Sequence, residues 1–222
     1  NRIAIVGLAA GTTARQALIV YPNCVIDGFE IDPKIIDVGQ AYFEMNHPQL
    51  NILNLDGRLG LAQSDQKYDI ISVDAYRAPY IPWHLTTIEF FNLTYEQLSD
   101  DGVLVINIGQ VPSDRTLVND LGTTIQKIYP TIFVMDIPGS FNSILFATKK
   151  PGSWENFENN YERLIDDQAH PLLIEAIKMT LQNQQPIPEK TRVYTDDKSP
   201  IEWVTNKIVI DFIFSGGMEN LP

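Results

Sequence analysis

The sequence has few of the residues on which several classes of protein depend. Its single cysteine, Cys24, excludes an internal disulfide framework, and we expect it to be a small buried apolar residue in a strand. It has no run of about 18 apolar residues, so we expect no membrane span within this chain. The three histidines are scattered without ligand spacing at positions 47, 84 and 170, so we expect no metal site.

Positive charge is also scarce. The 28 Asp and Glu residues outnumber the 16 Lys and Arg residues, which gives a formal net charge of −12 at pH 7. Such a surface repels nucleic acid, and no basic cluster with interleaved aromatic residues offsets it, so we expect no nucleic-acid partner. The sequence also has no GxSxG elbow, no Walker A lysine and no Cys–His pairing, so the mechanisms that depend on those motifs are excluded.

Strand and helix patterns alternate over residues 1–149, which is typical of an α/β fold with a doubly wound, Rossmann-like, mostly parallel sheet. The expected parallel strands are 2–7, 25–31, 51–55, 68–74 and 103–108, and the expected helices are 12–21, 33–44, 85–98 and 113–129. Strands 131–137 and 143–148 are too close for a helical crossover and should pair antiparallel at the sheet edge. The Lys-Lys-Pro-Gly-Ser stretch at 149–153 predicts a boundary between a nucleoside-binding domain, 1–149, and a helical C-terminal extension packed on it, 150–222.

The first thirty residues carry the clearest functional signal. A turn bounded by Gly7 and Gly11 follows the first strand, and Glu30 closes the second. In doubly wound folds the turn lets backbone approach a nucleotide, and an acid in the place of Glu30 accepts hydrogen bonds from the ribose hydroxyls. The alternative is that Glu30 caps the next helix, although Asp32 is better placed to do so. Ala9 stands where a GxGxxG motif would have its second glycine. This looser turn suits a sulfonium nucleoside, because such a ligand has no pyrophosphate to bind.

Two further acids follow strands. Asp56, before Gly57, either accepts a hydrogen bond from an adenine amino group or is a turn acid. Asp74 ends the most apolar strand, so it can act as a general base, bind a cationic amine, or cap the following loop. The loop is rich in aromatic residues, which either wall a cation site or pack the loop down: Tyr76, Tyr80 and Trp83.

The order of these motifs resembles the spermidine synthase family of polyamine aminopropyltransferases, which share the class I S-adenosylmethionine-dependent methyltransferase fold. The segments that carry the resemblance are 7–12, 28–33, 56–58, 68–76, 81–91 and 195–203. The last of these is similar to a branch of the family that is often fused to membrane segments. The chain begins at Asn1 inside a strand pattern, so we expect a piece of a longer polypeptide with its N-terminal region missing. We expect it to be cytoplasmic, or the soluble domain of a longer, membrane-fused protein.

The resemblance implies transfer of an aminopropyl group from decarboxylated S-adenosylmethionine to a small amine, without a metal. It implies that Asp74 takes a proton from the attacking amine, and we expect Tyr76 to be catalytic as well. The cofactor-binding residues that we expect are Gly7, Ala9, Gly11, Glu30, Ile31, Asp56, Gly57 and Asp74. The acceptor is a small-molecule amine or another small molecule, and a homodimer is compatible with the sequence.

Two departures from the family leave alternatives open. Ala10 stands where the family has an Asp that binds the amine of the donor, and Arg77 stands where it has a second acid in the loop. One alternative is a methyltransferase that uses intact S-adenosylmethionine on a small substrate. The other is a catalytically inactive nucleoside-binding or scaffold domain.

Overall fold

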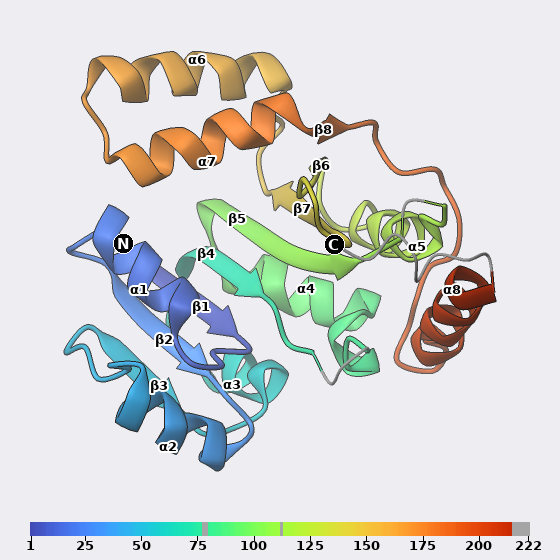
Figure 1. Cartoon of the computed structure of the whole chain (residues 1–222), viewed down its shortest axis with the longest axis horizontal. Helices are drawn as coiled ribbons and strands as arrows, with labels where there is room; N and C mark the ends of the chain where they lie inside the picture. Colours follow the sequence, from blue (N-terminus) through green and yellow to red (C-terminus); the bar gives the residue numbers. More distant parts are fainter. Residues whose placement is uncertain (77–79, 112, 215–222) are drawn as a thin grey trace.

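The computed structural model describes residues 1–76, 80–111 and 113–214, and Arg77 lies outside them. In this part of the chain an eight-stranded mixed sheet runs in the order β3-β2-β1-β4-β5-β7-β6-β8 (Figure 1). The strands are β1 (Arg2–Val6), β2 (Val25–Phe29), β3 (Leu50–Leu53), β4 (Tyr68–Val73), β5 (Leu98–Gly109), β6 (Thr131–Asp136), β7 (Asn142–Thr148) and β8 (Gln184–Gln185). The helices are α1 (Thr12–Val20), α2 (Pro33–Tyr42), α3 (Gly57–Gln63), the short 3₁₀ helix η1 (Trp83–Leu85), α4 (Ile88–Gln97), α5 (Thr116–Ile125), α6 (Trp154–Asp166), α7 (Pro171–Gln182) and α8 (Ile201–Phe214).

Strands β1 to β5 are parallel, as the alternating pattern predicts. The chain moves outward from β1 through β2 to β3 and then returns to place β4 on the other side of β1. The reversal lies at the carboxyl ends of β1 and β4, and open α/β sheets bind their ligands outside the strand ends at such a point, a region that we call the crevice. The expected antiparallel pair is confirmed as β6 and β7, and β7 also pairs antiparallel with β5.

Two hydrophobic cores cover the two faces of the sheet. One core packs α3, α4, α5 and α8 onto strands β1, β4, β5 and β7, and it includes the fully buried Phe90 and Phe91 of α4. The other packs α1 onto β1 and β2 and includes Leu18 and Met45. Cys24 lies in this second core and is 1% exposed, which confirms its expected burial.

Several elements differ from the prediction in extent. Helix α3 was not expected, because its seven residues are too few for a helical period; Asp56 caps its first turn. The predicted helix 85–98 is divided into η1 and α4, with Thr87 as the N-cap of α4. The predicted helix 113–129 is shorter, since α5 spans only Thr116–Ile125.

The segment after residue 149 forms three helices and the short strand β8. Helices α6 and α7 lie together along one end of the molecule, and β8 pairs antiparallel with β6 (Figure 1). Helix α8 packs on α5 at the edge of the molecule (Figure 1). No helix within the described ranges is both long and apolar enough to cross a membrane.

Candidate functional site

The turn after β1 brings backbone to the crevice. Gly7 and Gly11 have φ of 91° and 77°, in the left-handed region that glycine adopts readily. A Cβ on Gly7 would lie 2.5 Å from the backbone oxygen of Asp74, so the glycine lets the ends of β1 and β4 approach each other. Ala9, between the glycines, also has a positive φ of 48° and is exposed. The sequence-predicted turn residues therefore do lie at the reversal point of the sheet.

Glu30 is the buried acid of the crevice, with only 7% of its surface exposed. Its Oε2 accepts a hydrogen bond from the N–H of Ala9 at 2.9 Å, and its Oε1 accepts one from the N–H of Asp32 at 3.0 Å. Helix α2 is capped by Asp32, which accepts a hydrogen bond from the N–H of Lys34, so Glu30 is not the capping residue. Each carboxylate oxygen of Glu30 keeps a second lone pair, which a ribose hydroxyl can use. The ribose role stays a prediction, and the side chain of Ile31 is 69% exposed beside it.

Asp56 begins α3. Its Oδ1 accepts a hydrogen bond from the N–H of Leu59 at 3.1 Å, and its Oδ2 lies 2.8 Å from Nε2 of His84. The turn role that the sequence leaves open for Asp56 is therefore present, and the adenine role stays a prediction. A Cβ on Gly57 would lie 2.5 Å from Cγ1 of Val6, so this glycine allows α3 to pack against the end of β1.

Asp74 is exposed at the end of β4 and is held by Asn107, a residue that the sequence reasoning missed. Nδ2 of Asn107 donates to Oδ1 of Asp74 at 3.0 Å. A carboxylate only accepts hydrogen bonds, so the amide nitrogen must face it and the amide oxygen must face away. That oxygen is buried and has no hydrogen-bond partner among the described residues. The signal in the sequence is a polar residue in the apolar run of β5, close to the carboxyl end of the strand.

Tyr76 connects the loop after β4 to the end of β5. Its hydroxyl donates to the backbone oxygen of Asn107 at 3.0 Å and accepts from the N–H of Gly109 at 2.8 Å. Burial raises the pKa of Tyr76, so the hydroxyl stays protonated at neutral pH. Tyr80, at the other end of the loop, donates its hydroxyl proton to Oδ1 of Asn206 in α8 at 2.6 Å. Both ends of the loop are therefore fixed to the body of the protein, and the catalytic role of Tyr76 stays a prediction.

A polar network next to Asp56 fixes the C-terminal segment to the site. Arg58 donates two hydrogen bonds to the carboxylate of Asp196, at 2.7 and 2.8 Å, and one to the backbone oxygen of His84 at 3.0 Å. The hydroxyl of Thr87 donates to the same carboxylate at 2.7 Å, and the N–H of Asp196 donates to Oε2 of Glu89 at 3.0 Å. The hydrogen bonds from Arg58 hold the pKa of Asp196 below its usual value. Residues that are far apart in the sequence thus meet beside Asp56.

Ala10, which replaces the Asp that the family has at this position, lies beside the guanidinium of Arg15. Nη1 of Arg15 donates to the backbone oxygen of Ala10 at 2.8 Å and to that of Phe43 at 2.7 Å. Arg15 comes from the first turn of α1 and is half-buried. The electrostatic environment at this end of the turn is therefore more positive than an acid at position 10 would make it.

The side chains of the described ranges contain no group of three or more His, Cys, Asp or Glu residues arranged to hold a metal ion. Of the histidines, His84 pairs with Asp56, as described above. The rings of His47 and His170 accept hydrogen bonds from nearby backbone N–H groups.

Comparison with known proteins identifies the family. Residues 1–160 match the model of the spermine/spermidine synthase domain, which is more than half of the chain. The chain belongs to the spermine/spermidine synthase family. The resemblance seen in the sequence motifs is thereby confirmed.

Relatives in the family are similar to this chain over most of its length. It is 34% identical over 218 residues to a probable polyamine aminopropyl transferase of Bifidobacterium longum, which covers 91% of this chain and 48% of the relative. It is 30% identical over 209 residues to a polyamine aminopropyltransferase of Vibrio vulnificus, which covers 90% of this chain and 68% of the relative. The chain thus spans about half of the first relative and two thirds of the second.

A solved structure gives the same fold. A probable spermidine synthase of Corynebacterium glutamicum superimposes with a TM-score of 0.65 at 20% sequence identity, over 93% of this chain and 69% of that one. This likeness confirms the predicted fold class, a mostly parallel α/β sheet with antiparallel strands.

Proposed function

We propose that this spermine/spermidine synthase family member is a transferase that moves an aminopropyl group from decarboxylated S-adenosylmethionine to a small amine. The observation that carries the proposal is the position of Asp74. Its carboxylate follows the strand that lies beside the glycine turn, and Asn107 orients it. A carboxylate held at this point can receive a proton from an amine that attacks a donor lying across the crevice.

The chemistry requires little beyond positioning and one base. A primary amine carries a proton at neutral pH, as lysine does with a pKa of about 10.4, and it cannot attack in that form. Asp74 takes this proton, and the free electron pair forms a bond to the propyl carbon next to the sulfonium. The carbon–sulfur bond breaks, and its electron pair stays on sulfur as a neutral thioether. The positive sulfur is already an activated leaving group, so holding the two reactants together supplies much of the remaining acceleration.

The other site residues would bind the nucleoside. In the proposal, Glu30 accepts hydrogen bonds from the ribose hydroxyls, and Asp56 accepts one from the adenine amino group. The turn from Gly7 to Gly11 allows the donor to lie close to the backbone. Ile31 and Gly57 would contact the nucleoside from the ends of β2 and β3. Burial of Glu30 and its two backbone hydrogen bonds support this assignment, because they fix the carboxylate at the crevice.

A second candidate is transfer from intact S-adenosylmethionine. The guanidinium of Arg15 at the backbone of Ala10 favours it, because a cation at this end of the turn favours a donor that keeps its carboxylate. In this case the acceptor would gain a methyl group and the nucleoside product would be S-adenosylhomocysteine.

The proposed function has three further parts: a domain boundary at residue 149, a homodimer and a cytoplasmic location. The cytoplasmic location suits a reaction between two small water-soluble substrates.

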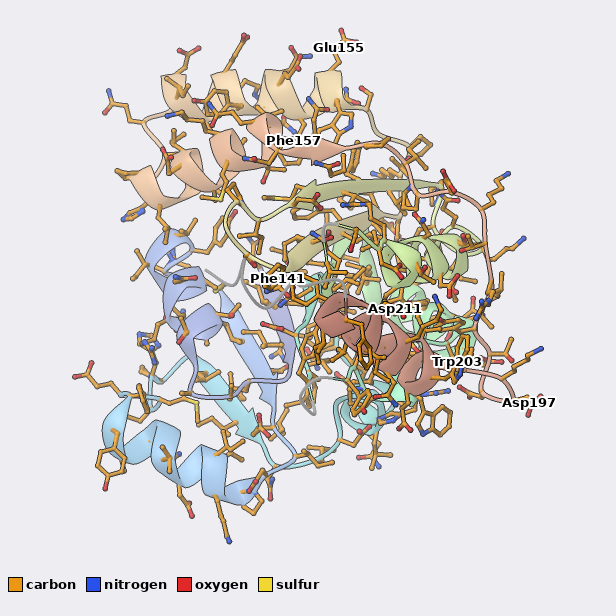
Figure 2. All side chains as sticks on the ribbon, turned by 45° about the vertical axis from the view of Figure 1, so that its right-hand side comes forward. Phe141, Glu155, Phe157, Asp197, Trp203 and Asp211 are labelled. Carbon is orange, nitrogen blue, oxygen red and sulfur yellow. The ribbon has the colours of Figure 1, made fainter. Side chains whose placement is uncertain are left out.

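The experiment that tests the proposal presents each donor with a panel of linear diamines of increasing length and identifies products by mass spectrometry. Methylthioadenosine together with an aminopropylated amine supports the proposal, and S-adenosylhomocysteine with a methylated acceptor supports the second candidate. Asp74→Asn should reduce the rate on the order of 10²-fold or more, the size of a lost general base. The matched control is Asp197→Asn, because Asp197 is exposed on the C-terminal segment, and it should keep full activity (Figure 2). Absence of any nucleoside product with either donor would overturn both candidates.

A further inference from the structure

We propose that His84 is a positioning residue for the nucleoside site. It fixes the carboxylate of Asp56, and through that carboxylate the protein selects adenine over hypoxanthine, the base in which an oxygen replaces the amino group. The inference rests on the proposed function, in which Asp56 accepts a hydrogen bond from the adenine amino group, and it adds to that site a residue that determines specificity.

Both oxygens of the Asp56 carboxylate are held. Oδ1 accepts the capping hydrogen bond from the N–H of Leu59 at 3.1 Å, and Oδ2 lies 2.8 Å from Nε2 of His84. A carboxylate only accepts hydrogen bonds, so Nε2 of His84 carries the proton in this pair. With one partner on each oxygen the plane of the carboxylate is set, and each oxygen keeps a further lone pair for a ligand.

The His84 ring is itself held by two contacts. The backbone oxygen of His84 accepts a hydrogen bond from Nη1 of Arg58 at 3.0 Å, and both carboxylate oxygens of Asp196 bind Arg58 in turn. The indole ring of Trp83 packs edge-on against the imidazole at 5.7 Å between ring centroids, which limits rotation of the imidazole. His84 therefore reaches Asp56 from a fixed position in η1.

The capping of α3 does not account for this arrangement. An N-cap needs one side-chain oxygen, and Oδ1 of Asp56 supplies it. The contact between Oδ2 and His84 adds little to stability, because the side chains of His84 and Asp56 are 29% and 30% exposed and a pair so open to water is weak. The same exposure lets a ligand reach the carboxylate. The contact with His84 therefore acts mainly on what Asp56 binds.

An oriented carboxylate distinguishes two bases that differ in one group. Adenine presents an N–H donor from its amino group, whereas hypoxanthine presents a carbonyl oxygen at the same position. The carboxylate binds the first and repels the second, because two acceptors would then face each other. Hypoxanthine also carries an N–H on the neighbouring ring nitrogen, to which a mobile carboxylate could turn. His84 prevents Asp56 from turning, so the site rejects the base that lacks the amino group.

The test measures the dissociation constants of methylthioadenosine, the nucleoside product of the proposed reaction, and of methylthioinosine by isothermal titration calorimetry, which requires no turnover. The wild type should bind methylthioadenosine on the order of tenfold to a hundredfold more tightly, which corresponds to one hydrogen bond to a charged group. His84→Leu should bind methylthioadenosine more weakly and reduce that ratio to about threefold or less. His84→Gln should retain most of the ratio, because the amide nitrogen of glutamine can replace Nε2 as the donor.

Two controls separate positioning from other effects. His47→Leu is the matched control, because His47 precedes β3 at the end of the sheet opposite to the crevice, where its ring accepts a hydrogen bond from the N–H of Gln49. This variant should leave both dissociation constants unchanged. Asp56→Asn should itself lower the ratio, and His84→Leu should add little to that loss in the double variant, because His84 acts through Asp56.

The outcomes distinguish this inference from the function on which it rests. A wild type that discriminates, together with an unchanged ratio in His84→Leu, would overturn the role of His84 and leave the proposed function standing. A ratio that His84→Gln fails to restore in a folded protein, as judged by its melting temperature, would also overturn that role. A wild type that binds the two nucleosides equally would refute the adenine role of Asp56, and a wild type that binds neither would overturn the nucleoside site as a whole.

Discussion

Replacing Glu30 with glutamine tests the centre of the site through both stability and binding. The carboxylate accepts two backbone N–H groups, from the turn after β1 and from the start of α2. Glutamine has the same shape but one acceptor, and its amide nitrogen would face a second donor. Of the two hydrogen bonds to the carboxylate, one then becomes a bond to a neutral amide oxygen. The other backbone N–H loses its acceptor, at a residue that is only 7% exposed.

The expected loss follows from these two changes. A hydrogen bond to a charged group contributes about 1.5–3 kcal/mol and an unpaired buried donor costs about 1–3 kcal/mol, so the free energy of unfolding should fall by about 3 kcal/mol. For a chain of this length that corresponds to a melting temperature lower by about 6–12 °C. The control is Glu158→Gln on the exposed side of α6, which should change stability by less than about 0.5 kcal/mol.

The same variant tests the ribose role. A donor nucleoside at about a hundred times its dissociation constant should stabilise the wild type by about 2.7 kcal/mol in a thermal-shift assay. Glu30→Gln should lose most of that increase. If Glu30→Gln had the same melting temperature as the control Glu158→Gln, the structural argument would be refuted. If its melting temperature were lowered but the nucleoside raised it as much as in the wild type, only the ribose role would be refuted.

Three further predictions concern positions around the crevice. Gly7→Ala should cost about 3 kcal/mol or more in chemical denaturation, because its Cβ would meet backbone at 2.5 Å in a left-handed conformation; a normal midpoint would contradict this. Tyr194→Phe should cost about 2 kcal/mol, because the fully buried hydroxyl donates to the 1% exposed Asp120 at 2.7 Å; an unchanged free energy of unfolding would contradict a stabilising role for this hydrogen bond. The lowered pKa of Asp196 means that its pairing with Arg58 stabilises the fold fully above about pH 4 and is lost as the pH falls through that lowered value. The stability difference between the wild type and Asp196→Asn should therefore shrink in denaturant titrations below pH 4, and a constant difference would exclude the ion pair as its cause.

The sequence predicts those features of the fold that depend on local patterns. Alternating apolar runs locate β1 to β5, and the Asp-Pro pair at 32–33 locates the start of α2, where Asp32 is the N-cap. The short spacing between the strands at 131–137 and 143–148 predicts their antiparallel pairing. Each of these signals lies within a few residues of the element that it specifies.

The rest of the site depends on contacts between distant segments. Asn107 appears in the sequence only as one polar residue in a strand, and its role becomes visible when β5 lies beside β4. Helix α3 is too short to show a period, so its packing through Gly57 on Val6 was not predicted. Asp196 lies 138 residues from its partner Arg58, and no local pattern connects them.

The separation of 138 residues between Arg58 and Asp196 affects the order in which the protein folds and gains its nucleoside site. The crevice is assembled from residues 1–109, but the contact that fixes its Asp56 side comes from Asp196, which follows Arg58 by 138 residues. Closing so long a loop is a late and entropically costly step, so nascent chains should form the sheet before they acquire affinity for a nucleoside. A chain shortened to end before Asp196 should therefore keep its sheet but lose the contact that fixes the Asp56 side of the crevice, and ligand affinity, not secondary structure, would report that loss.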